Sequence, residues 1–313
     1  MKKIFQKTKN NHKIKPSIPL QDNENVVGYT FIAPWLIGFF IFTVYPILYS
    51  FYLSFTDYNI LSSPKFIGLE NYKEMFVSDP LYWKSVKATF YYVFTAVPLR
   101  LIFALIVALL LCRETKGIGI YRSALYIPSL IGGSVAVAVM WRRIFEAEGI
   151  LNSTLALFGI ESNIAWLGHP TYTIWTIIIL GAWQFGSPML IFLSGLKQIP
   201  NTYYESAVID GAGWFKRFFH ITLPLLTPII FFNLVMQLIS GFMIFTQGLI
   251  ITGGGPLNTT LFYALYLYRN AFQFGKMGYG CAMAWVMLVV IGLFTLVLFK
   301  TSKYWVHYEA EEG

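Results

Sequence analysis

Six apolar runs constrain this chain more than any other feature of its sequence. They cover residues 29–55, 88–111, 123–141, 171–196, 222–251 and 277–299, and Arg100 is the one charged residue within them. Each run matches or approaches the roughly 20 residues that an α-helix needs to cross a hydrocarbon core of about 30 Å. The runs therefore predict an all-α, polytopic membrane protein with a bundle of about six transmembrane helices.

The composition excludes other architectures. Hydrophobic residues make up 56% of the chain and charged residues 12%, which leaves too little polar surface to cover a soluble globule. A transmembrane β-barrel needs short strands of alternating polarity, whereas residues 101–111 are apolar on every side. The first run is too long for the apolar part of a cleaved signal peptide, so we expect it to remain as a span. One transmembrane domain is expected over residues 26–304, with tails at 1–25 and 305–313.

The basic residues predict the orientation. The net charge is +8, and 14 of the 23 Lys and Arg residues fall on the inner side if the amino terminus is inside. The positive-inside rule then favours both termini in the cytoplasm of a bacterial inner or plasma membrane, with the basic tail held near anionic lipid. Because the basic residues do not gather on a soluble module, no nucleic-acid partner is expected.

The sequence offers no site for a cofactor. Cys112 and Cys281 fall near opposite ends of their spans and are expected to stay unpaired, and the four histidines lack Cys or carboxylate partners at metal-ligand spacing. No Gly-x-x-x-x-Gly-Lys-Ser/Thr segment occurs, and the glycine run at 253–255 is followed by Pro256. This run is expected to form a sharp turn, because three glycines followed by proline cannot continue a helix.

The long inner loop at 197–222 carries the most information. Pro200 should end the fourth span, and Thr202 stands three residues before Glu205, which is the spacing of a capping box and predicts a short helix. Gly211 and Gly213 should end this helix, and a second short helix from Trp214 should lead to the kink at Pro224. A helix, a glycine turn and a helix would form a compact knob suited to a socket on a cytosolic partner.

This pattern resembles the cytoplasmic EAA loop of binding-protein-dependent ABC importer permeases. In that loop Glu-Ala-Ala is followed by a Gly six residues after the Glu and then by Ile-x-Leu-Pro. The corresponding residues here are Glu205, Ser206, Ala207, Gly211 and the Ile-Thr-Leu-Pro at 221–224. Ser206 replaces the first Ala, and its small side chain fits the same packed face.

The resemblance extends along nearly the whole chain and is closest to the carbohydrate, or maltose-type, branch. Residues 45–50, 54–58, 67–72 and 252–256 also look like that branch. The resemblance implies the transmembrane domain of a type I ABC importer, with a second and different permease subunit, a cytosolic ABC ATPase dimer that binds ATP and Mg, and an outer solute-binding protein. It also implies that the loop forms coupling helices, in which Glu205 contacts the ATPase, Gly211 is the hinge and Ala207 packs. The ATPase-coupling residues are then Glu205, Ser206, Ala207, Asp210, Gly211 and Pro224. Without the resemblance, the sequence predicts only that Glu205 caps a helix and that Gly211 ends one.

Polar residues inside the spans are candidates for the solute pathway. Arg100 has apolar neighbours on both sides, and a charge at that depth must face protein or water. It either pairs with a carbonyl or hydroxyl, such as that of Thr95 or one on another span, or lies on the pathway, where it would suit an acidic saccharide. The uncharged candidates carry the hydrogen-bond donors and acceptors that a sugar needs. Each of them is equally plausible as a polar contact between helices. They are Gln184, Asn233, Gln237, Ser240, Thr246 and Gln247.

Two other functions were weighed against a sugar-importing permease that works by alternating access. A secondary carrier without an ATPase should place several ionisable residues at the membrane midplane, and only Arg100 qualifies. A membrane enzyme should gather a nucleophile, a carboxylate pair or a His cluster at one face, and no such group stands out. The secondary carrier is the stronger of these two alternatives.

Overall fold

The computed structural model describes residues 24–112, 116–160 and 164–307, and nearly all of its regular structure is helical. Residues 1–23 of the expected amino-terminal tail and 308–313 of the expected carboxy-terminal tail lie outside the described part. The chain divides into two units, Met1–Tyr52 and Leu53–Gly313.

The first unit is one apolar helical stretch. It consists of α1 (Glu24–Phe39), the π-helical turn η1 (Phe40–Val44) and α2 (Tyr45–Leu53), whose last residue begins the second unit. Trp35 stacks on Phe39 with ring centroids 5.3 Å apart, and Phe31 and Phe42 are 82% and 80% exposed. The stretch Gly28–Leu53 is long and apolar enough to cross a membrane. Apolar side chains on all sides are suited to lipid rather than water.

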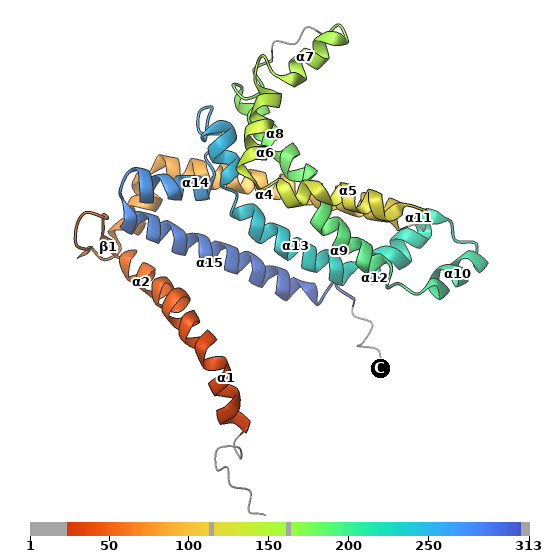
Figure 1. Cartoon of the computed structure of the whole chain (residues 1–313), viewed down its shortest axis with the longest axis horizontal. Coiled ribbons are helices and arrows are strands. Elements are labelled where there is room, and N and C mark those ends of the chain that lie inside the picture. The colour runs from red at the N-terminus through yellow and green to blue at the C-terminus, as the bar shows by residue number, and fades with distance from the viewer. Residues whose placement is uncertain (1–23, 113–115, 161–163, 308–313) are drawn as a thin grey trace, which may run out of the picture. The chain divides into compact units, whose positions relative to one another are not determined.

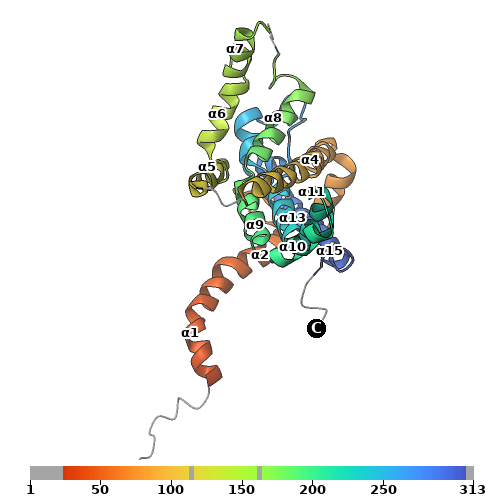
Figure 2. The same cartoon turned by 90° about the vertical axis from the view of Figure 1, so that its right-hand side faces the viewer.

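The second unit is a helical bundle around α4 (Figure 1). Helices α8, α9 and α13 pack against α4, and α15 lies along α13 (Figure 2). Small buried residues on α4, among them Ala96, Ala104 and Ala108, let the neighbouring helices approach closely. In chain order the elements are β1 (Thr56–Asp57), β2 (Lys65–Phe66), α3 (Glu70–Lys73), η2 (Glu74–Ser78), α4 (Pro80–Leu111), α5 (Ile118–Ile131), α6 (Val135–Phe145), α7 (Ile150–Leu157), α8 (Pro170–Trp183), α9 (Gly186–Leu196), α10 (Asn201–Ile209), α11 (Trp214–Arg217), η3 (Phe218–Thr222), α12 (Leu223–Leu225), α13 (Thr227–Phe242), η4 (Gly248–Thr252), α14 (Tyr263–Tyr268), η5 (Arg269–Gln273) and α15 (Met277–Ser302).

The expected spans are present, and three of them are bent. Three helices of the described residues are long and apolar enough to cross a membrane, and three bent helix pairs raise the number to six if each pair is one span. The bends are 94° between α5 and α6, 40° between α8 and α9, and 64° between α12 and α13. Bends of this kind free backbone groups that must find partners inside the protein.

Helix α4 begins eight residues before the expected boundary at 88. Asp79 caps it, since Oδ1 accepts hydrogen bonds from the backbone N–H groups of Leu81 (2.9 Å) and Tyr82 (3.1 Å), and Pro80 occupies the first helical position. Oδ2 of Asp79 accepts hydrogen bonds from the hydroxyls of Tyr266 and Tyr279, both at 2.6 Å. One carboxylate thus joins α4, α14 and α15 at this end of the bundle. Burial and the hydrogen bond to Asp79 both raise the pKa of Tyr266, which therefore stays a donor.

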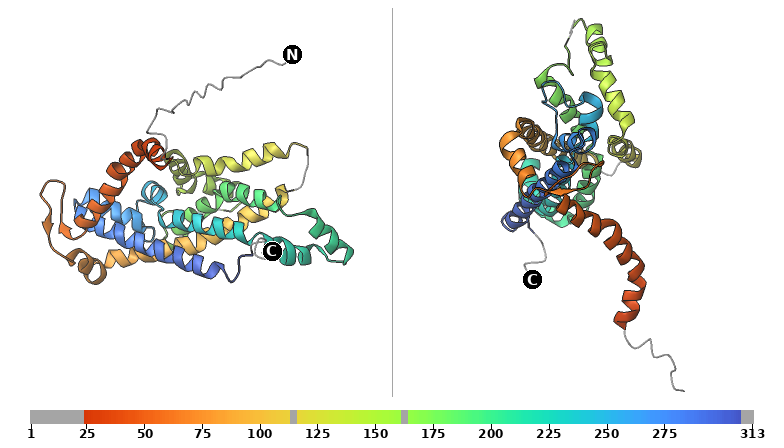
Figure 3. Two further views of the ribbon diagram at one scale, coloured as in Figure 1. Left: turned by 90° about the horizontal axis from the view of Figure 1, so that it is seen from below. Right: turned by 90° about the vertical axis from the view of Figure 1, so that its left-hand side faces the viewer.

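The loop at 197–222 lies at the other end of the bundle. Figure 1 and Figure 3 both show α10 and α11 beyond the end of α9, at the end opposite to β1. Helix α6 packs against η4, and α7 follows at its far end (Figure 2). The expected turn after the fifth span is also present, because Gly253 and Gly254 adopt left-handed φ values of 56° and 85°.

Candidate functional site

The loop at 197–222 folds as a helix, a glycine turn and a helix. Helix α10 ends in a Schellman motif, in which the N–H of Ala212 bonds to the carbonyl of Ala207 (2.8 Å) and the N–H of Gly211 to that of Val208 (3.0 Å). Gly211 occupies the left-handed position with φ of 73°, and Gly213 precedes α11. The predicted knob is therefore confirmed, with α10, Asp210 at its end, the turn and α11 as its parts.

The predicted capping box is wrong. Helix α10 begins at Asn201, one residue before Thr202, and its preceding residue is Pro200 without a side-chain cap. The proline fixes the backbone just before the helix, and the exposed first turn leaves its free N–H groups to water. Thr202 instead accepts a hydrogen bond at its carbonyl from the Ser206 hydroxyl (2.9 Å).

The acidic residues of the knob are exposed, and a tyrosine connects the knob to the base of the loop. Glu205 and Asp210 are exposed, and within the described residues neither forms an ion pair. Tyr204 is half-buried, and its hydroxyl lies 3.0 Å from that of Thr222 at the base of the loop. Ala207 is also partly buried, whereas the neighbouring Val208 is 55% exposed.

Apolar side chains surround the outward face of the knob. Ile209 is 87% exposed, Phe215 71% and Trp214 56%, and Trp214 stacks on Phe218. Exposed apolar side chains of this kind are found at protein–protein and membrane contacts. The pattern of the loop consists of charged and small residues, so the sequence gives no role to these apolar side chains.

Pro224 lies in α12, just before the 64° bend that leads into α13. Its carbonyl accepts a hydrogen bond from the Thr227 hydroxyl (2.6 Å), and this hydroxyl in turn accepts the N–H of His307 (2.9 Å). The kink expected at this proline is present, and its freed carbonyl is satisfied within the bundle.

A second site lies inside the bundle, where the broken helices meet. A cavity of about 250 Å³ is bordered by the middle of α4, the breaks between α5 and α6 and between α8 and α9, and the chain from α13 to η4. Five of the predicted pathway residues line the cavity. A sixth, Gln237, is hydrogen-bonded to Arg100, which is one of the five. The five are Arg100, Gln184, Ser240, Thr246 and Gln247.

Arg100 connects α4 to two other helices at this cavity. Its Nε donates a hydrogen bond to the carbonyl of Gly181 (2.6 Å), and its Nη1 donates to Oε1 of Gln237 (2.6 Å). One partner is a backbone carbonyl on another span, which is one of the alternatives that the sequence left open. Gly181 lies near the end of α8, where the partial negative charge of the helix favours a cation.

Gln184 holds two helix breaks together. Its Nε2 donates to the carbonyl of Gly132 in the α5–α6 break (3.0 Å), and its own carbonyl accepts from Ser129 on α5 (2.9 Å). The Ser129 hydroxyl also accepts the N–H of Ser187 at the start of α9 (3.0 Å). The polar groups released by one break are thus satisfied by the other.

Asn233 lies apart from the cavity. It is fully buried in α13, and its Nδ2 donates a long hydrogen bond to the carbonyl of Pro188 on α9 (3.4 Å). In this structure Asn233 is a contact between helices, which is the second of the two roles that the sequence left open.

Tyr92 and Gly181 are among the residues of the cavity that were not foreseen from the sequence. Tyr92 lies two turns before Arg100 on α4, and its hydroxyl faces Gly181. A Cβ added to Gly181 would lie 2.7 Å from the Tyr92 hydroxyl and 3.1 Å from Nη2 of Arg100. An aromatic residue two turns from a buried arginine is a usable sequence signal, whereas nothing in the sequence singles out Gly181.

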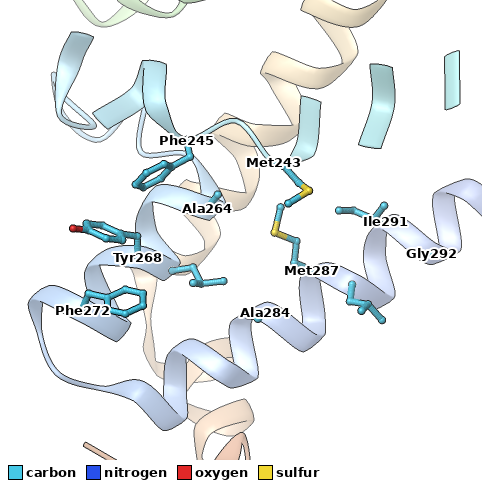
Figure 4. Close-up of a pocket in the computed structure, with 11 residues that line it drawn as sticks. Met243, Phe245, Ala264, Tyr268, Phe272, Ala284, Met287, Ile291 and Gly292 are labelled. Atoms are coloured by element: carbon cyan, nitrogen blue, oxygen red, sulfur yellow. The ribbon is translucent and has the colours of Figure 1, made fainter. Parts of the chain in front are cut away.

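A larger pocket of about 730 Å³ has a different character (Figure 4). Its lining is apolar apart from the Tyr268 hydroxyl, and Met243 and Met287 face one another across it. Met243 and Phe245 line both this pocket and the polar cavity. The apolar pocket offers few hydrogen bonds to a sugar, so the smaller cavity is the candidate for a polar solute.

Comparison with known proteins places the chain in a family. Residues 82–304 match the family model described as the binding-protein-dependent transport system inner membrane component. The chain is 58% identical over 291 residues to the probable ABC transporter permease protein YesP of Bacillus subtilis, covering 92% of this chain and 94% of that protein. It is 32% identical to the trehalose/maltose transport system permease protein MalF of Thermococcus litoralis, covering 91% of this chain and 96% of MalF.

The fold is also that of a solved transporter. The chain superimposes with a TM-score of 0.77 and 20% identity on a chain of a bacterial alginate ABC transporter solved in complex with an alginate pentasaccharide-bound periplasmic protein, covering 89% of this chain and 94% of the other. The bent spans and the knob are therefore found in a chain that belongs to the binding-protein-dependent transport system inner membrane components, the membrane permeases of ABC transporters.

Proposed function

We propose that this chain is a permease subunit of an ATP-driven importer, that it moves a sugar or oligosaccharide inward by alternating access, and that it is driven through the knob centred on Glu205 and Gly211. The observation that carries the coupling role is the knob itself: outward acidic and apolar side chains on a short helix pair at one end of the bundle. Such a surface lacks a partner within the described chain and suits a socket on a soluble protein.

The connection between the knob and the cavity supports this mechanism. The knob continues through η3 and α12 into α13, and α13 carries Gln237, which bonds to Arg100 at the cavity. A displacement of the knob therefore reaches the cavity through one helix with one bend. Rigid helices that rock about such a bend are a recognised form of domain motion.

The proposed partners are those that the resemblance to importer permeases implies. An ABC ATPase dimer in the cytosol binds ATP and Mg and contacts Glu205, Ser206, Ala207 and Asp210 on the knob. A second permease subunit, a different chain, completes the pathway, and an outer solute-binding protein delivers the sugar. The protein lies in the bacterial cell membrane with both termini in the cytoplasm. Trehalose and maltose are named for MalF, and a carbohydrate cargo is proposed here because the polar cavity offers the hydroxyl, amide and guanidinium groups that sugars require.

The proposal is tested by replacing Glu205. Glu205→Ala should weaken co-purification with the ATPase and lower ATP-dependent sugar uptake by about tenfold, because a charge-assisted contact to the partner is lost. The matched control is Glu148→Ala, which removes another exposed acid, between α6 and α7, and should leave both unchanged. Unchanged docking and uptake in Glu205→Ala would remove the coupling role. Solute accumulation by the chain in vesicles without any ATPase would instead favour a secondary carrier.

A further inference from the structure

Among the residues that the structure describes, no Asp or Glu pairs with the positive charge of Arg100. Its hydrogen-bonded partners are the Gly181 carbonyl and the Gln237 amide oxygen, and the Tyr92 hydroxyl lies close to Nη2. All three groups are uncharged. No Asp or Glu occurs in any of the six apolar runs, so the spans themselves hold no carboxylate for this guanidinium.

A structural role explains only part of this arrangement. Bonding to the end of α8 needs a donor, which an uncharged side chain also supplies, whereas a guanidinium inside a membrane protein is costly to keep. Nε and Nη1 are directed to Gly181 and Gln237, while Arg100 itself borders the cavity. The charge is therefore placed where a solute arrives.

The rest of the cavity wall fits the hydroxyl groups of a sugar. Thr246 and Gln247 border the cavity and, within the described residues, donate or accept no hydrogen bond through their side chains. Ser240 also borders it, and its hydroxyl donates to the carbonyl of Met236 (2.9 Å) while keeping its acceptor capacity. One cation among neutral donors and acceptors matches a solute with one acidic group among hydroxyls.

We infer that the cavity receives a saccharide that carries a carboxylate, as a uronate residue does, and that Arg100 pairs with this carboxylate during transport. The planar guanidinium suits the two oxygens of a carboxylate. The carboxylate of the solute then neutralises the positive charge of Arg100, for which the spans hold no acidic residue. This inference rests on the proposed function, because it names the kind of sugar that the same cavity accepts.

The test compares acidic and neutral forms of the same sugars. The full-length chain, in complex with its partner subunits in lipid nanodiscs, is titrated with short oligomers of galacturonate, glucuronate and mannuronate and with their carboxyl-reduced counterparts. The expected result is that at least one acidic oligomer binds about tenfold more tightly than its reduced counterpart. Equal binding of every acidic oligomer and its counterpart, or binding of neither, would overturn the inference.

Two variants separate charge from structure. Arg100→Gln removes the charge, and Gln237→Glu supplies a carboxylate of nearly the same shape that neutralises Arg100 from within while keeping their contact. Both should bring the ratio of acidic to neutral affinity close to one, and Arg100→Lys should restore part of it. Gln237→Glu keeps the test decisive if Arg100→Gln does not fold.

The control is Arg142→Gln, since Arg142 is exposed on α6, away from the cavity, and pairs with Glu146 (3.4 Å). It should keep the preference of the wild type. A preference that survives in both Arg100→Gln and Gln237→Glu would show that Arg100 is only a helix contact. ATP-dependent import of neutral sugars alone would overturn this inference and leave the proposed function standing, whereas no saccharide import at all would overturn the proposed function.

Discussion

Gly181 limits how the cavity is built at the scale of single residues. An alanine there would place its Cβ 2.7 Å from the Tyr92 hydroxyl and 3.1 Å from Nη2 of Arg100, so both groups must move. Gly181→Ala is expected to destabilise the protein by about 1–3 kcal/mol, as overpacking does, and to lower sugar uptake. Thermal unfolding of the purified complex and uptake in cells measure the two effects.

The matched control for this substitution is Gly292→Ala. Gly292 lies inside α15, and an added Cβ there meets nothing within 4 Å. Alanine in such a helix position is expected to be neutral or to stabilise by about 0.5–1 kcal/mol. If Gly181→Ala and Gly292→Ala had the same thermal stability and the same uptake, the close approach of Tyr92 and Arg100 to Gly181 would not matter for stability or transport.

Individual site residues were predictable where they break the apolar pattern. Arg100 stands out because a charge inside a span demands a partner, and Gln184 and Gln237 stand out as polar groups in apolar runs. The sequence did not distinguish Asn233 from them, because the same amide chemistry serves a helix contact and a cavity wall. The packing of α13 against α9 gives Asn233 a contact between helices in this structure, and its place on the solute pathway stays a prediction.

At the scale of elements, the sequence predicted the spans and the bend near Pro224, and not the bends between α5 and α6 and between α8 and α9. The breaks near Gly132 and Gln184 fall inside continuous apolar runs, where the hydropathy pattern gives no boundary. They are stable because Gln184 and Ser129 satisfy backbone groups across the breaks, a pairing between segments far apart in the chain. The start of α4 was placed too late because the cap at Asp79 and Pro80 precedes the apolar run by several polar residues.

The turn in the knob depends on the conformation of one glycine. Gly211 has φ of 73° with nothing within 4 Å of an added Cβ, so alanine there meets conformational strain and no clash. Gly211→Ala is expected to cost about 1–2 kcal/mol in the turn and to lower uptake, because the two helices of the knob can no longer hold their angle. Gly211→Asn should retain more uptake, since asparagine tolerates the left-handed region.

Gly213→Ala is the matched control in the same turn. Gly213 has φ of −67° and is equally open, so its replacement carries no comparable strain. Uptake and co-purification of the ATPase, measured side by side for the three variants, give the comparison. Loss of function in Gly213→Ala with none in Gly211→Ala would contradict the role assigned to the left-handed residue.

At the scale of the whole molecule, the bent pair α8 and α9 connects the tip of α7 to the knob. If this pair is one span, the order of the elements predicts that the knob and the tip of α7 lie on opposite sides of the membrane. The distribution of basic residues predicts that the knob side is the cytoplasm, and an ATPase can drive the bundle only from that side. The orientation is therefore a requirement of the proposed function.

Cysteine labelling checks this orientation with a matched pair of positions. Ile209 on the knob is 87% exposed and Leu157 at the end of α7 is 86% exposed, so each should react readily after replacement by cysteine. The two native cysteines, Cys112 and Cys281, are free thiols and are first replaced by alanine. A membrane-impermeant maleimide should then label Leu157→Cys in intact spheroplasts and Ile209→Cys only after lysis. Added ATPase should protect Ile209→Cys and leave Leu157→Cys reactive, because the partner covers the knob. Labelling of Ile209→Cys in intact spheroplasts would place the knob outside and remove the route by which ATP hydrolysis reaches α13.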